Sequence, residues 1–123
     1  VIAPTVELVK RLHARHPQVP VIGFPKGAGG KLPAYARETG VDAIGLDETV
    51  DPVWADANLP DGLPVQGNLD PLALIAGGAP LDAAIDAIRG AFPARPHVFN
   101  LGHGILLDTP IAHVEQLLAR IRS

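Results

Sequence analysis

The strongest constraint in this sequence is a repeat in which a short apolar run ends at a polar or glycine-containing turn and is followed by residues with helical spacing. A first helix is expected over residues 5–16, and four such units follow it, with apolar runs at residues 20–24, 41–46, 63–65 and 97–100. The runs are short and do not alternate, which is typical of parallel strands covered on both faces. The repeat therefore predicts an α/β fold with a parallel sheet.

Local signals mark several of the helix boundaries. Asp51 and Asp70 each precede a proline, and this pair of residues suits the N-cap and first position of a helix. Pro80 is expected to open a longer helix with apolar residues at helical spacing, namely Leu81, Ala84, Ile85 and Ile88. The last helix is expected to start at Thr109-Pro110 and to bury Val114, Leu117, Leu118 and Ile121.

Two architectures accommodate this order of elements, a small doubly wound sheet and half of a (β/α)8 barrel. Each apolar run ends in a polar or glycine-rich turn, and in a barrel those turns surround one mouth, where binding residues gather. The turns favour the half barrel, and we expect the chain to be a C-terminal piece of a longer protein. The absence of any methionine, even at position 1, agrees with that expectation. Four units leave two sheet edges to be closed by more chain or by a second copy.

Composition excludes several classes of function. The net charge is −3 and the basic residues form no cluster, which argues against a surface for nucleic acid. No stretch approaches the roughly 18 apolar residues of a membrane span. Cysteine is missing, so disulfides and thiolate metal sites are excluded for this sequence.

The turn after the first apolar run is rich in glycine and contains Lys26. It fails the phosphate-loop pattern, because Pro25 stands where the first glycine belongs and Leu32 stands where a hydroxyl residue is needed. We interpret it as a flexible connection. Lys26 either points into the mouth or is a solvated surface lysine.

Polar residues also follow the second and third runs. Asp47 and Glu48 are neighbours at a strand end and point to opposite sides, so one of them can face the mouth, and we select Asp47. Asp47 could equally accept backbone N–H groups of its own turn. Asn68 could bind a ligand or hold its turn, whereas Asp70 is expected to cap the helix that follows.

His103 lies between Gly102 and Gly104, just past the fourth apolar run. The two glycines leave its ring accessible, and a histidine titrates near neutrality and both donates and accepts hydrogen bonds. Spacing alone favours a bystander in a loop. The histidines lack the spacing of metal ligands on a helix, and the only serine, Ser123, lies outside any nucleophile motif.

Taken together, the stretches VPVIGFPKGAG, GVDAIGLDETV, VQGNLDP and FNLGHGILLDTPIAHVEQLL resemble the C-terminal part of the uroporphyrinogen decarboxylase family. The resemblance covers nearly the whole chain. It implies a single (β/α)8 TIM-barrel domain, of which residues 1–123 would be the C-terminal half, about four strand-helix units, with the N-terminal half absent. It implies the decarboxylation of the four acetate side chains of uroporphyrinogen III to give coproporphyrinogen III. It also implies a cytoplasmic homodimer in haem and chlorophyll synthesis, with no metal or organic cofactor.

The resemblance also assigns residues. His103 matches the histidine that contacts substrate in the family, which reverses the expectation from spacing, while proton donation by its ring stays open. Lys26, Asp47 and Asn68 are candidates for lining the pocket. The catalytic aspartate and the carboxylate-binding arginines are expected in the missing half, so the chain alone should be inactive. Glu48 stands where the family commonly has tryptophan, which we expect to affect only local packing.

Two alternatives remain open. The chain could belong to a related barrel enzyme that acts on another substrate. It could also be a non-catalytic half barrel that pairs its exposed edges with another copy.

Overall fold

The four apolar runs form one parallel sheet, with its strands in the order β1-β2-β3-β4. The computed structural model describes all 123 residues. The strands are β1 (Ile22–Gly23), β2 (Ala43–Gly45), β3 (Val65–Gln66) and β4 (His97–Val98). Each strand pairs in parallel with the next one along the chain. This sequential order is that of adjacent barrel strands, and it lacks the reversal that defines a doubly wound sheet.

Six α-helices accompany the strands, and three of their boundaries differ from those expected. They are α1 (Ile2–Arg15), α2 (Leu32–Glu38, after the 3-10 turn η1, Gly29–Lys31), α3 (Pro52–Asn58), α4 (Pro71–Ala76), α5 (Gly78–Ala91) and α6 (Ile111–Arg122). Helix α1 begins at Ile2 rather than at residue 5. Helix α5 begins before Pro80, because a proline in the first turn lacks only an N–H that has no partner within the helix. Helix α6 begins after Pro110, whose backbone is extended, and Thr109 does not cap it.

The two predicted aspartate caps are confirmed. Asp51 accepts a hydrogen bond from the backbone N–H of Trp54 at 3.0 Å, at the start of α3. Asp70 accepts one from the backbone N–H of Leu72 at 2.8 Å, at the start of α4. Both bonds satisfy donors that the helix itself leaves free.

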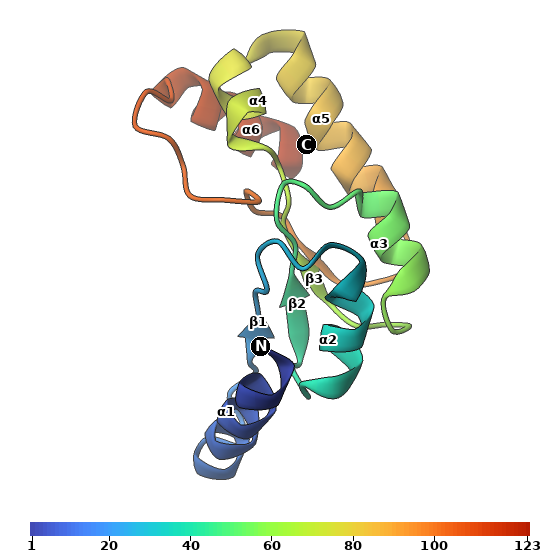
Figure 1. Cartoon of the computed structure of the whole chain (residues 1–123). Helices are drawn as coiled ribbons and strands as arrows, with labels where there is room; N and C mark the ends of the chain where they lie inside the picture. Colours follow the sequence, from blue (N-terminus) through green and yellow to red (C-terminus); the bar gives the residue numbers. More distant parts are fainter.

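Helices cover one face of the sheet and leave the other open, so the expectation of two covered faces is wrong for this chain. Helices α2, α3 and α5 lie along the convex side of a curved molecule (Figure 1). Ile44 and Val65 are register partners and are fully buried on the helical side. Phe24 and Val98 are each about half exposed. The open face is where the interior of a barrel would lie.

At the amino ends of the strands, the buried guanidinium of Arg95 holds the turn between α3 and β3. Its Nε donates to the Asp56 carboxylate at 2.6 Å, and its two terminal nitrogens donate to the backbone carbonyls of Asp56, Pro60 and Leu63 at 2.8 to 3.1 Å. The side chain of Arg95 is only 5% exposed. Four bonds to one planar group fix the segment that leads into β3.

At the carboxyl ends, the turn after β4 crosses the sheet and packs against the turn after β2. A methyl group added at Gly102 would lie 2.6 Å from Glu48 Cα and 2.8 Å from the carbonyl carbon of Asp47. These are backbone atoms, which cannot move aside as a flexible side chain can. A side chain at position 102 is therefore incompatible with the observed approach of the two turns.

We predict that Gly102→Ala destabilises the fold by about 1–3 kcal/mol, because the added methyl overpacks a contact between two backbones. Gly104→Ala is the matched control, since nothing lies within 4 Å of the position its methyl would take. Urea unfolding at neutral pH measures both effects. Equal unfolding midpoints for the two variants would show that the turns do not pack as described.

Candidate functional site at the carboxyl ends of the strands

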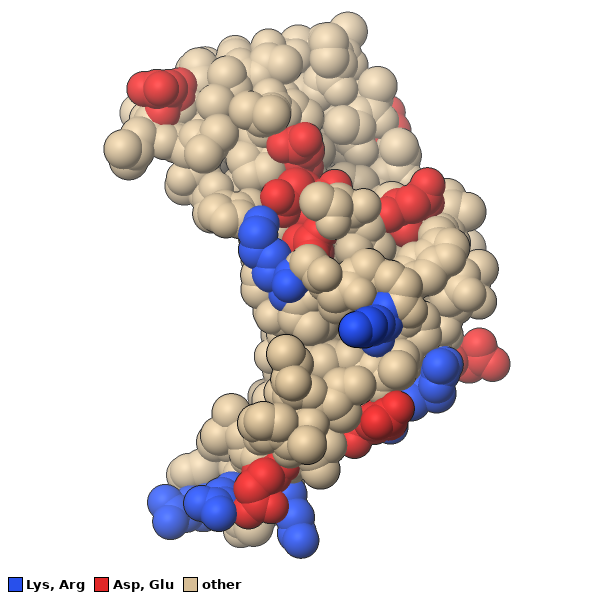
Figure 2. Space-filling model, in the orientation of Figure 1, with Lys and Arg blue, Asp and Glu red and all other residues tan.

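A cavity of about 600 Å³ opens at the carboxyl ends of the strands. Phe24 and Lys26 line it from the turn after β1, and Gly45 and Leu46 line it from the end of β2. Gln66 lines it from β3, and residues 100–105 line it from the turn after β4. Figure 2 shows the molecule bent around a hollow, with basic and acidic side chains meeting near its middle. Every strand unit thus contributes to one concave surface, as the carboxyl ends of parallel strands do.

A second cavity, of about 640 Å³, lies between the start of α1 and the turn after β1. It includes Lys26, Lys31 and Tyr35 but no residue of β2, β3 or β4. Only the first cavity therefore joins all four units, and we take that one as the candidate site.

His103 lines the candidate cavity on an exposed loop, and its ring forms no hydrogen bond with the rest of the chain. The loop is held at its base. The Asn100 side chain accepts from the backbone N–H of Leu101 at 2.8 Å, and the Gly102 N–H donates to the Leu69 carbonyl at 2.8 Å. A fixed loop therefore presents an imidazole with both ring nitrogens available.

Lys26 lines the same cavity and forms an ion pair with Glu48. Its Nζ lies 3.1 Å from Glu48 Oε1. The side chain of Lys26 is 47% exposed and that of Glu48 is 24% exposed. Hydrogen bonds from the backbone N–H of Glu48 and from the Lys26 ammonium hold the pKa of the Glu48 carboxyl below its ordinary value.

Asp47 is buried behind the cavity rather than among the residues that line it. Its carboxylate accepts the Gly27 N–H at 2.7 Å and the Thr49 N–H at 2.8 Å, and it also accepts the Thr49 hydroxyl. Burial opposes ionisation. The hydrogen bonds from Thr49 and Gly27 and the charge of Lys26 outweigh it, so the pKa of Asp47 lies below its ordinary value.

Asn68 is also buried outside the cavity. Its amide donates to the backbone carbonyls of Asp47 at 2.9 Å and Val50 at 2.7 Å. Of the four sequence candidates, the structure brings His103 and Lys26 together at the cavity. It places Asp47 and Asn68 in the framework that supports the turn after β2.

Sequence reasoning missed two contributors. Gln66 ends β3 and lines the cavity, and its position before a glycine at a strand end was the available signal. Glu48 forms a contact with a residue of another unit, Lys26, so its role extends beyond local packing. No local pattern indicates a pairing across 22 positions.

The other polar clusters offer no metal centre. No group of three or more histidine, aspartate or glutamate residues is arranged to hold a metal ion. His97 and His113 are hydrogen-bonded to the backbone carbonyls of Gly67 and Leu74 at 2.6 and 2.9 Å. None of the helices has both the length and the apolar character required to cross a bilayer.

We predict that Asp47→Asn destabilises the fold by about 1–3 kcal/mol at neutral pH, because an amide accepts the three donors less well than a carboxylate does. The folded-state pKa of Asp47 is lowered, so its stabilisation is present above the ordinary pKa of 3.8 and is lost as the pH falls through the lower folded value. The difference in the free energy of unfolding between wild type and Asp47→Asn should therefore shrink once the pH falls below the folded-state pKa of Asp47.

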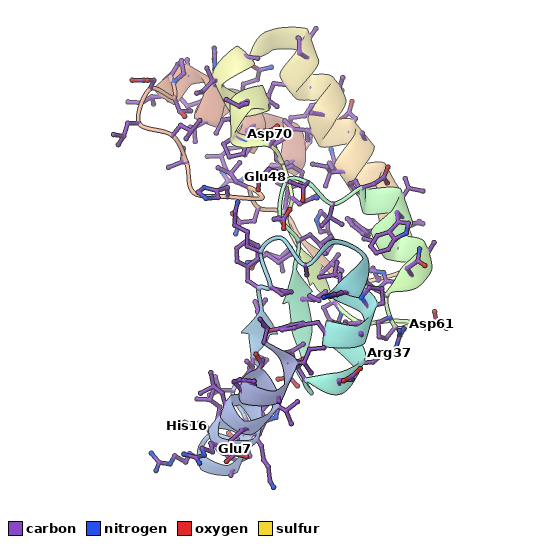
Figure 3. The ribbon with its side chains drawn as sticks, in the orientation of Figure 1. Glu7, His16, Arg37, Glu48, Asp61 and Asp70 are labelled. Carbon is purple, nitrogen blue, oxygen red and sulfur yellow. The ribbon has the colours of Figure 1, made fainter.

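Urea unfolding across acidic and neutral pH measures this effect. Asp61→Asn removes the same charge from an exposed loop at the opposite end of the sheet and serves as the control (Figure 3). A constant difference in the free energy of unfolding between wild type and Asp47→Asn, from neutral to strongly acidic pH, would contradict a stabilising role of the ionised Asp47 carboxylate.

The uroporphyrinogen decarboxylase (URO-D) family model matches residues 1–123. The chain is 84% identical over 122 residues to a uroporphyrinogen decarboxylase of Rhizorhabdus wittichii and 76% identical over 122 residues to that of Sphingopyxis alaskensis. It is 61% identical over 123 residues to that of Erythrobacter litoralis. These alignments cover 99 to 100% of the chain and 36% of each relative, so the chain spans about a third of the length of the curated relatives it matches. A match along every residue, with identity this high, shows that the chain belongs to the uroporphyrinogen decarboxylase family.

Proposed function

We propose that residues 1–123 are the C-terminal portion of a single (β/α)8-barrel domain and form part of its mouth. The enzyme would remove carbon dioxide from the four acetate side chains of uroporphyrinogen III and release coproporphyrinogen III. The observation that carries the proposal is the exposed imidazole of His103 on the cavity at the carboxyl ends of the strands. Sequential parallel pairing of the strands and family membership support it.

The reaction needs an electron sink, because loss of carbon dioxide leaves the bonding electron pair on the former acetate carbon. Protonation of a pyrrole carbon makes the ring itself that sink. A further proton then converts the acetate carbon to a methyl group, and the ring gives up the proton it first received. The protein must stabilise positive charge on the pyrrole and hold the carboxylates in place.

His103 suits the second task directly. Its ring nitrogens are free of protein partners, so one N–H is available to a substrate carboxylate at the cavity. Proton delivery to the pyrrole is the alternative role for the same group. Both roles need an accessible imidazole on a loop that is fixed at its base, as this one is.

We expect the other groups of the mechanism in the part of the protein that corresponds to the remainder of these relatives, outside residues 1–123. We expect an aspartate facing the pyrrole N–H groups and arginines gripping carboxylates there, with no metal or organic cofactor. A cytoplasmic homodimer is part of the same proposal.

We predict that His103→Ala in the full-length enzyme lowers kcat/KM for uroporphyrinogen III by about 10- to 100-fold, as expected for the loss of one hydrogen bond to a charged group. His103→Gln separates the two roles, since glutamine donates a hydrogen bond but not a proton. Substantial recovery by glutamine indicates contact, and equal loss in both variants indicates proton delivery.

His16→Ala is the matched control, because His16 is exposed at the far end of α1 (Figure 3). Steady-state kinetics on purified enzymes provide the measurement. Wild-type kinetics in His103→Ala would contradict the placement of substrate at this cavity.

We also predict that residues 1–123 alone do not decarboxylate uroporphyrinogen III, because the proposed aspartate and arginines lie elsewhere. Anaerobic incubation followed by separation of the porphyrins measures conversion. Steady product formation by the isolated chain would place the catalytic groups within it.

A further inference from the structure

The candidate cavity has an unusual distribution of charge. Lys26 is the only permanently charged side chain in its lining, and the carboxylate of Glu48 lies beside the lining, 3.1 Å from the Lys26 ammonium. The other polar side chains in the lining are the amides of Gln66 and Asn100 and the imidazole of His103. Within this chain, the Lys26 ammonium is therefore the group of the lining that an anionic ligand can contact.

The ammonium of Lys26 has donors to spare. Its Nζ lies 3.1 Å from one oxygen of Glu48 and 3.5 Å from the other, so that carboxylate engages at most two of its N–H groups. A lysine ammonium has three N–H donors. At least one is left for a second carboxylate, which can bind without breaking the existing ion pair.

Glu48 is well placed to fix that ammonium. Its backbone packs against Gly102 in the turn that carries His103, and Figure 3 shows it at the turn beyond β2. A free lysine side chain loses considerable rotamer freedom on binding a ligand. A partner that holds Nζ beforehand reduces this loss, which improves affinity through preorganisation.

We propose that Lys26 is a substrate-binding residue that recognises a carboxylate of the tetrapyrrole, and that Glu48 positions its ammonium. The inference rests on the proposed function and adds a specific contact to it. A lysine suits such a contact because its ammonium is a compact positive charge with three N–H donors, enough to hold Glu48 and a substrate carboxylate at the same time.

Steady-state kinetics of the full-length enzyme with uroporphyrinogen III test the inference. Lys26→Met removes the charge and keeps the length of the side chain, and it should raise KM about 10-fold while kcat stays within about twofold, as loss of uniform binding requires. Lys26→Arg should keep KM within about threefold of wild type. Lys10→Met, on the exposed surface of α1, is the control for loss of a lysine charge and should leave KM unchanged.

The role of Glu48 is tested by a double-mutant cycle. Glu48→Gln should raise KM about threefold in the wild-type background and should have no further effect in the Lys26→Met background, because it acts through Lys26. Thermal unfolding of each variant identifies any general loss of structure. Independent, additive effects of the two substitutions would overturn the positioning role.

The outcomes separate this inference from the proposed function. No conversion by the wild-type enzyme would overturn both. Conversion by the wild type, together with an unchanged KM in Lys26→Met, would overturn the carboxylate contact alone. A fall in kcat and in the unfolding temperature for both Lys26→Met and Lys26→Arg would show a structural lysine and would also overturn it.

Discussion

The buried carboxylate of Asp47 joins the turns after the first two strands. It accepts one N–H from its own turn, at Thr49, and one from Gly27 in the turn after β1. Because Gly27 follows Lys26 directly, this bond also sets where the lysine side chain begins. The turn after β4 then rests on the backbone of residues 47 and 48 through Gly102. The turns after β1, β2 and β4, three of the four units that line the cavity, are therefore positioned by contacts with Asp47 and Glu48.

The side chains of Asp47 and Glu48 point in opposite directions and have different roles. Asp47 points into the protein, where its carboxylate accepts three hydrogen bonds and is buried away from the cavity lining. Glu48 points outward and pairs with Lys26 at the cavity. Consecutive residues at a strand end face opposite sides, and this geometry lets one turn be both anchor and binding surface. Rigid support behind an exposed polar group is what precise ligand placement requires.

The sequence predicted those features of the fold that depend on residues close together in the chain. The order of strands and helices followed from apolar runs, and the caps at Asp51 and Asp70 followed from side chains that bond within two or three residues. Helix starts were less predictable, since Pro80 is compatible with two positions in a first turn. Of the four candidate site residues, His103 and Lys26 lie at the cavity, and their contact with substrate stays a prediction. The burial of Asp47 and Asn68 depends on which side each turn presents after packing. The Lys26–Glu48 pair depends on the spacing of two parallel strands, which no short pattern contains.

The two ion pairs described here lie at opposite ends of the sheet and differ in their access to solvent. The contrast lies in the two cations, since the side chain of Lys26 is 47% exposed, whereas that of Arg95 is 5% exposed and is enclosed by Asp56 and three backbone carbonyls. Dissolved ions weaken the interactions of solvent-exposed charges over a Debye length of about 10 Å at 0.1 M ionic strength, and they weaken those of enclosed charges much less. Rising ionic strength should therefore weaken the electrostatics of the cavity while leaving the base of the sheet intact. Salt concentration thus becomes a means of adjusting the cavity without loosening the scaffold that carries it.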